Sequence, residues 1–99
     1  MCRSTATRTV TVANPEGLHL RAAMLIAEVA RRHQADVKMT KGLDCVDAKS
    51  VLQVMSLGAY EGEELLLEAE GPGAETVIEE LAQLFARHFR HEQQHTEQE

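Results

Sequence analysis

A histidine stands directly before a helical segment in the run NPEGLHLRAA, which covers residues 14–23. The Pro-Glu-Gly sequence indicates a turn, and the residues from Leu20 onward indicate a helix. His19 is therefore expected at a helix N-terminus, where unpaired backbone N–H groups and the helix dipole favour an anion. Arg21 adds a positive charge that suits a phosphate group. The pattern predicts phosphoryl chemistry at His19 and Arg21, and the alternative is an inert surface histidine.

The other four histidines are weaker candidates for chemistry. His33, near the end of the same helical segment, is expected to be a C-terminal cap or a partly buried side chain. His88, His91 and His95 have helical spacings that could place metal ligands on one face. A polar, frayed tail is the favoured interpretation, because metal sites need ordered ligands and supporting contacts. We therefore expect no metal and no other cofactor.

Composition and charge exclude several classes of protein. The chain has 99 residues, of which 43% are hydrophobic, so one domain with a modest core is expected. Its formal net charge of −6 argues against a general nucleic-acid binder. It lacks the run of about 18 apolar residues that a membrane helix needs, and its first residues lack the apolar segment of a signal peptide. Cys2 and Cys45 are far apart, so reduced thiols in a cytoplasmic protein are expected.

Strand and helix patterns alternate along the chain. Half-buried strands are predicted by alternating polarity in four segments: residues 7–13, 35–39, 43–46 and 64–70. Helical periodicity marks three more: about fifteen residues from Leu20, residues 48–58 with Asp47 as the cap, and a long segment after the GPG run that carries Phe89. This order predicts an α+β fold, in which helices cover one face of a four-stranded, mainly antiparallel sheet.

The segment 48–58 carries one apolar stripe more than a short helix on a sheet can bury. Ser50 stands at the edge of the stripe expected to face the sheet: Val46, Val54 and Leu57. A second stripe lies about 100–200° around the helix from Ser50: Val51, Leu52 and Met55. Loops could cover the second stripe, but a partner-docking patch is the favoured interpretation, and Met24 on the first helix could extend it.

Two motifs resemble the HPr family, the histidine-containing phosphocarriers of the bacterial phosphoenolpyruvate-dependent phosphotransferase system. GLHLRAA is similar to the active-site signature of that family, and AKSVLQVMSLG is similar to the signature around its regulatory serine. The spacing of the motifs also matches, and the resemblance covers roughly residues 5–90. It implies an open-faced β-sandwich with the order βαββαβα, as a single domain over residues 1–91. Residues 92–99 are then a polar tail.

The resemblance also implies roles for individual residues. His19 becomes the phosphoryl acceptor, through Nδ1, and Arg21 steadies the phosphate. Ser50 becomes the site that an HPr kinase phosphorylates. The patch described above becomes the partner-docking surface: Met24, Val51, Leu52 and Met55. The family signature has proline where this chain has Ala22, and alanine keeps its backbone N–H. The helix is still expected to form at this position. The properties that the change is expected to affect are the rigidity of the His19 loop and the rate of transfer.

The implied function is that of a monomeric carrier and not of an enzyme. It would accept a phosphoryl group from phospho-enzyme I and donate it to an enzyme II A component, for sugar uptake or regulation. HPr kinase/phosphorylase and regulators are possible further partners. The alternative is a regulatory interaction module that phosphorylation of Ser50 switches, without a role in transport.

Overall fold

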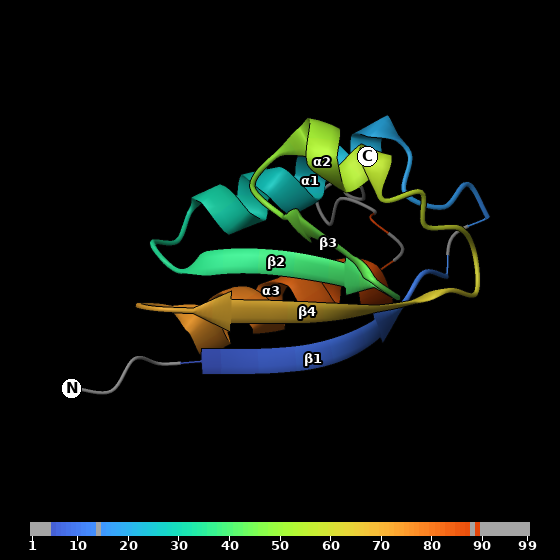
Figure 1. Cartoon of the computed structure of the whole chain (residues 1–99). Helices are drawn as coiled ribbons and strands as arrows, with labels where there is room; N and C mark the ends of the chain where they lie inside the picture. Colours follow the sequence, from blue (N-terminus) through green and yellow to red (C-terminus); the bar gives the residue numbers. More distant parts are fainter. Residues whose placement is uncertain (1–4, 14, 88, 90–99) are drawn as a thin grey trace.

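The described part of the chain forms four strands and three helices in the order βαββαβα (Figure 1). The computed structural model describes residues 5–13, 15–87 and 89. The elements are β1 (Thr5–Thr11), α1 (Leu20–Arg31), β2 (Asp36–Lys41), β3 (Asp44–Asp47), α2 (Val51–Ser56), β4 (Glu64–Glu70) and α3 (Ala74–Ala86). The expected order of elements is confirmed.

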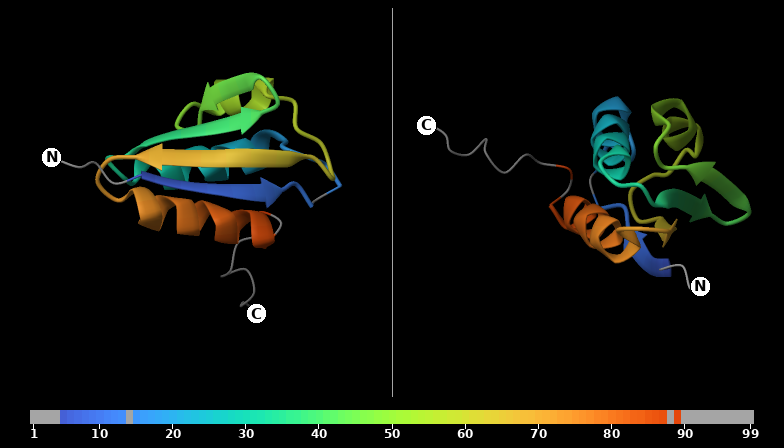
Figure 2. Two further views of the ribbon diagram at one scale, coloured as in Figure 1. Left: turned by 60° about the horizontal axis from the view of Figure 1, so that its bottom comes forward. Right: turned by 90° about the vertical axis from the view of Figure 1, so that its left-hand side faces the viewer.

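All neighbouring strands of the sheet are antiparallel, in the spatial order β1-β4-β2-β3. The end-on view in Figure 2 shows the helices on one side of this sheet, with the other side uncovered. The predicted open-faced β-sandwich is therefore confirmed. No helix in the described part of the chain is both long and apolar enough to span a membrane.

Alternating polarity places one face of each long strand in the core. Val10 and Val12 are buried whereas Thr9 and Thr11 are exposed, as the sequence predicts. The strand itself differs from the expected 7–13: it begins at Thr5 and ends at Thr11. The reason is the pairing with β4, which aligns all seven residues of β1 with residues 64–70.

The core lies between the sheet and the helices and is mostly aliphatic. Its fully buried large side chains come from both layers: Val12, Ile26, Val37, Met39, Val54, Leu65, Leu67, Val77 and Leu81. On α1 the inward side is mostly alanine, which allows the helix backbone to lie close to the sheet: Ala22, Ala23, Ala27 and Ala30. The helix has twelve residues, fewer than expected. Its C-cap is Arg32, whose backbone N–H donates hydrogen bonds to the carbonyl oxygens of Val29 and Ala30 in the last turn.

The second helix begins at Val51 and not at residue 48, so the prediction of Asp47 as its cap is wrong. Ser50 is the N-cap, and its Oγ accepts a hydrogen bond from the Gln53 N–H at 3.3 Å. Asp47 ends β3, and its Oδ1 accepts from the Lys49 N–H at 2.9 Å, which stabilises the turn before the helix. The capping signal was present in the sequence, since Ser50 and Gln53 have the spacing of a capping box.

The third helix ends at Ala86, although Phe89 was expected to continue its apolar stripe. Phe89 is buried beyond the helix end, where its φ of 62° lies in the left-handed region. Its ring lies edge to face with Phe85, with 4.8 Å between centroids. Several expected features lie outside the described residues: Cys2, His88, His91, His95 and the tail 92–99.

Candidate functional site

His19 is the N-cap of α1, at the point where the chain leaves an extended conformation and enters the helix. Its side chain is half-buried. The backbone N–H of Ala22 donates to Nδ1 of the ring at 3.4 Å. The next amide, that of Ala23, donates to the carbonyl oxygen of His19 at 2.9 Å and starts the helical hydrogen bonds. The ring is thus turned back over the first turn of the helix.

The residues before His19 are fixed to the segment after α2. The Leu18 N–H donates to the carbonyl oxygen of Ala59 at 3.0 Å. Gly17 has φ +71°, and a Cβ at this position would lie 2.7 Å from the same oxygen. Only glycine therefore permits this approach, because a side chain would meet both a strained φ and backbone atoms.

The carboxylate of Glu63 stabilises the segment after α2. Glu63 Oε1 accepts from the Tyr60 N–H at 2.7 Å and from Lys41 Nζ at 3.3 Å. Lys41 Nζ also donates to the carbonyl oxygen of Gly58 at 2.9 Å. The Tyr60 amide, with help from Lys41, lowers the pKa of Glu63 against the opposing effect of its partial desolvation. The residues that flank Ala59 are therefore tied to β2, and the His19 loop is supported through them.

An open groove runs along α1 beside His19. Its volume is about 670 Å³, and its lining combines apolar and charged side chains: Leu20, Arg21, Met24, Leu25, Glu28, Arg31, Arg32 and Val51. Arg21 is exposed, and its guanidinium forms no hydrogen bond or ion pair with the described residues. A cation in this state is available to an incoming anion.

The expected docking patch is exposed for the most part. Leu52 is 80% exposed, Met24 54% and Met55 38%. The expectation that Val51 is exposed is corrected. Val51 is half-buried because it packs against the hydrophobic core, and it also lines the groove along α1. Leu20, the residue after His19, is 53% exposed and was not among the predicted site residues. Its spacing of four residues from Met24 is the signal that could have identified it.

Ser50 lies at the junction between the ends of two elements. Arg31, the last residue of α1, donates from Nε to the carbonyl oxygen of Lys49 at 2.8 Å. Lys49 Nζ in turn donates to the carbonyl oxygen of His33 at 3.0 Å. Two cationic side chains thus join the segment before α2 to the C-terminal end of α1. Ser50 is the next residue after Lys49 in this segment.

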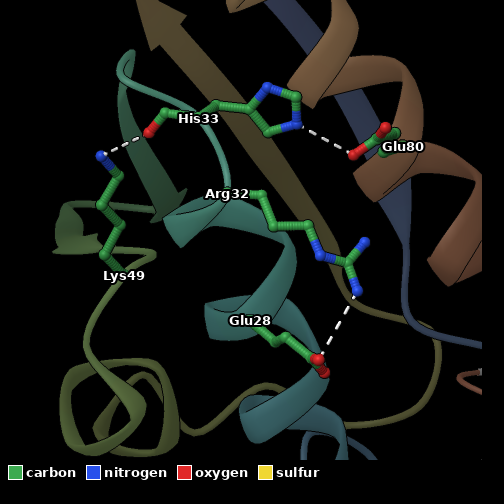
Figure 3. A network of polar contacts seen from close by, with 5 residues as sticks. All are labelled: Glu28, Arg32, His33, Lys49 and Glu80. Atoms are coloured by element: carbon green, nitrogen blue, oxygen red, sulfur yellow. Dashed lines mark hydrogen bonds and ion pairs between the residues drawn. The ribbon is translucent and has the colours of Figure 1, made fainter.

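His33 links this junction to α3 (Figure 3). Its Nε2 lies 3.0 Å from Oε1 of Glu80, and its side chain is mostly buried. The expectation of a partly buried histidine near the helix end is confirmed, and Glu80 is a partner that the sequence did not reveal. Glu28 and Arg32 form a separate i,i+4 pair on the surface of α1, at 3.5 Å. Within the described ranges, no group of three His, Cys, Asp or Glu side chains could hold a metal ion.

The chain is similar to known phosphocarriers. A family model described as "PTS HPr component phosphorylation site" matches residues 6–87. The chain is 37% identical to the phosphocarrier protein HPr of Cupriavidus necator over 82 residues, which cover 83% of this chain and 92% of that protein. It is 35% identical to HPr of Treponema pallidum over 85 residues, or 86% and 97% of the two chains.

A solved structure gives the same result for the fold. The crystal structure of HPr-C-His from Thermoanaerobacter tengcongensis superposes with a TM-score of 0.83 and 33% sequence identity. The match covers 88% of this chain and 98% of that chain. The residues that the family model matches, 6–87, include both signature segments.

Proposed function

This chain belongs to the HPr family, the phosphocarriers of the phosphotransferase system, and we propose that His19 is the residue that carries the phosphoryl group. The observation that supports this role is the position of His19 at the N-terminus of α1, half-buried, with Nδ1 turned toward the first helical amides. Helix N-termini stabilise phosphate groups through free N–H donors and the helix dipole.

The phosphoryl donor in this proposal is the phosphohistidine of enzyme I, and the acceptor is an enzyme II A component. The lone pair on Nδ1 of His19 attacks phosphorus. A new N–P bond forms while the N–P bond of the donor breaks, and its electron pair returns to the donor ring. Transfer onward is the same exchange with His19 as the donor. The protein gains no net chemical change over a cycle and acts as a carrier in the cytoplasm.

Arg21 is the residue proposed to neutralise the transferred charge. Its guanidinium has no partner among the described residues, so pairing with phosphate would cost it no existing ion pair. Guanidinium groups bind phosphate through charge-assisted and often bidentate hydrogen bonds. Because Arg21 lines the open groove, a partner on this face also brings its own groups close to the same phosphate.

Partner binding is assigned to the exposed apolar side chains around the groove. Leu20 and Met24 on α1 and Leu52 and Met55 on α2 flank the half-buried Val51. Methionines can adapt to different surfaces, which suits a carrier that meets a donor and an acceptor in turn. A small patch also favours weak complexes, which a carrier must leave quickly.

Ser50 is proposed as a second, regulatory phosphorylation site, used by HPr kinase/phosphorylase. Its Oγ caps α2, and α2 carries the exposed Leu52 and Met55 of the docking patch. A phosphate there would place about −1.5 to −2 charges beside partner contacts. A regulatory module without transport remains the second candidate function, and the position of Ser50 in the cap next to Leu52 is what favours it.

The test is phosphorylation with phosphoenolpyruvate and enzyme I, followed by intact-mass measurement at neutral and acid pH. Wild type is expected to gain one acid-labile phosphoryl group, and His19→Ala is expected to gain none. His33→Ala is the matched control, because His33 lies at the other end of α1, and it should be phosphorylated as wild type is. Acid-labile phosphorylation of His19→Ala would contradict the assignment of the carrier residue.

A further inference from the structure

The amide of Ala22 has no carbonyl acceptor in the helix. The first intrahelical bond of this turn is made one residue later, by the Ala23 N–H. Ala22 is fully buried, with 0% of its surface exposed, so its N–H is shielded from water. A buried amide needs an acceptor, and the acceptor present is Nδ1 of His19 at 3.4 Å. The histidine ring is therefore part of the capping of its own helix.

This hydrogen bond has a chemical consequence for the ring. A backbone N–H can donate only to a nitrogen that holds a free lone pair. In neutral imidazole one nitrogen carries the proton and the other carries the lone pair. The bond from Ala22 therefore favours the tautomer with the proton on Nε2 and the lone pair on Nδ1. It also limits rotation of the ring, because the lone pair has to point at the amide.

We propose that the Ala22 amide is a positioning group that selects the reactive tautomer of His19. During transfer its hydrogen bond passes from Nδ1 to a phosphoryl oxygen, a step called the handover here. This proposal rests on the proposed function for its second half, the handover. Before transfer, the amide holds the Nδ1 lone pair in place. For transfer, the hydrogen bond from Ala22 breaks and the ring turns Nδ1 toward phosphorus. The Nδ1–P bond forms as the N–P bond of the donor breaks, the Nε2 proton stays on the ring, and the amide is left without its acceptor. The phosphoryl group is bonded to Nδ1, so one of its oxygens is the nearest new acceptor for the Ala22 N–H.

The residue at position 22 decides whether this device exists. A proline has no N–H, so it can neither select the tautomer nor donate to the phosphate. Proline would break no helical hydrogen bond here, because the Ala22 amide makes none with a carbonyl. Ala22→Pro is therefore a suitable test variant, and Ala22→Gly, which keeps the amide, is its matched control.

The tautomer is measured in the unphosphorylated proteins by two-bond ¹H–¹⁵N correlation spectra of the histidine rings. We expect the ratio of the Nε2–H to the Nδ1–H tautomer of His19 to fall by about twofold in Ala22→Pro. This effect is at the lower end of what a hydrogen bond contributes, because a donor–acceptor distance of 3.4 Å is long. Ala22→Gly should keep the wild-type ratio. An unchanged ratio in a folded Ala22→Pro protein would overturn the proposal.

A second measurement needs no change at position 22. In His19→Ala the amide proton of Ala22 loses its acceptor, so its resonance should move upfield. The Ala23 amide is the internal control, because it donates to the backbone carbonyl of residue 19, which the substitution keeps. Equal, small shifts of both amides would overturn the proposal, and a shift confined to Ala22 supports it.

The handover is tested on the phosphorylated proteins. In wild type and in Ala22→Gly, the amide proton of residue 22 should lie downfield in the phosphorylated form, as expected for a donor to a phosphoryl oxygen. An amide that moves upfield, as one without an acceptor would, contradicts the handover. Failure of wild type to accept a phosphoryl group at His19 refutes the proposed function instead, and the tautomer result stands apart from it because it uses unphosphorylated protein.

Discussion

The backbone N–H of Leu18 donates to the carbonyl oxygen of Ala59 at 3.0 Å, and this bond joins the first signature segment to the residue that directly follows the second. Leu18 precedes the histidine at the start of α1, and Ala59 follows the end of α2. The loop that carries His19 is therefore positioned by the residue that directly follows the second signature. Changes on either side of this bond should affect the same site.

Gly17→Ala is expected to destabilise the protein more than Gly42→Ala. Both glycines have similar positive φ values, +71° and +60°, so both substitutions carry the left-handed penalty of about 1–2 kcal/mol. Only at Gly17 does the new Cβ meet a backbone oxygen, at 2.7 Å, whereas nothing lies within 4 Å of a Cβ at Gly42. The contact should add about 1–3 kcal/mol to the loss in free energy of unfolding. Equal losses in urea unfolding would show that the approach to Ala59 is not restrictive.

Leu52→Ala should leave stability nearly unchanged and should slow transfer from enzyme I at subsaturating concentrations. Leu52 is 80% exposed, so its removal should change the free energy of unfolding by no more than about 0.5 kcal/mol. Val54→Ala is the matched control on the same helix. Val54 is fully buried, so this variant should lose about 2 kcal/mol and keep its transfer rate at temperatures where it is folded. If transfer were slowed in Val54→Ala but not in Leu52→Ala, the exposed face of α2 would not be part of the docking patch.

Substitutions of Ser50 should separate capping from charge. Ser50→Ala removes the oxygen that accepts from the Gln53 N–H and should cost about 1 kcal/mol, with an unchanged transfer rate. Ser50→Asp keeps a capping oxygen and adds a negative charge that a helix N-terminus favours, so its stability should stay within about 0.5 kcal/mol of wild type. Its transfer rate should fall, because the charge stands beside partner contacts. Equal rates of phosphorylation by enzyme I for Ser50→Asp and wild type would argue against regulation through this residue.

The carboxylate of Glu63 should contribute stability that is lost in acid. Because the Tyr60 amide and Lys41 lower its pKa in the folded state, the folded protein favours the ionised form. The contribution is present above the unfolded pKa, near 4.3, and disappears as pH falls below it through the lower folded value. Glu63→Gln keeps an oxygen for the Tyr60 N–H and removes the charge.

The melting temperatures of wild type and Glu63→Gln should therefore differ at pH 7 and converge toward pH 3. Glu61→Gln changes an exposed side chain of the same turn and should follow the wild-type curve at each pH. A difference between wild type and Glu63→Gln that persists at pH 3 would mean that the charge of Glu63 is not the cause.

The layers of the fold were predictable because polarity alternates clearly in the sequence. Val10 and Val12, and Leu65 and Leu67 on β4, are buried as the pattern requires. The start of α2 was misplaced because Asp47 and Ser50 are both good capping residues. The choice between them depends on a contact that spacing alone did not decide: Asp47 accepts from the Lys49 amide and is used in the turn.

Parts of the candidate site could be read from the sequence, and parts depend on tertiary contacts. The place of His19 before a helix follows from the turn and the helical pattern. The bond from Leu18 to Ala59 does not, because it joins segments that are distant in sequence. Val51 was expected to be exposed with Leu52 and Met55, but it packs against the hydrophobic core, which is formed by tertiary approach of the elements. Local periodicity carries no information about such an approach.

The strand order has a consequence for the biosynthesis of the site. β4 is the last strand to be made, yet it lies between β1 and β2, and β1 pairs with no other strand in the described sheet. During translation the hairpin of β2 and β3 can form early, whereas β1 must wait for residues 64–70. A nascent chain or proteolytic fragment that stops before residue 64 thus contains both His19 and Ser50 without the central strand that organises the layer beneath them.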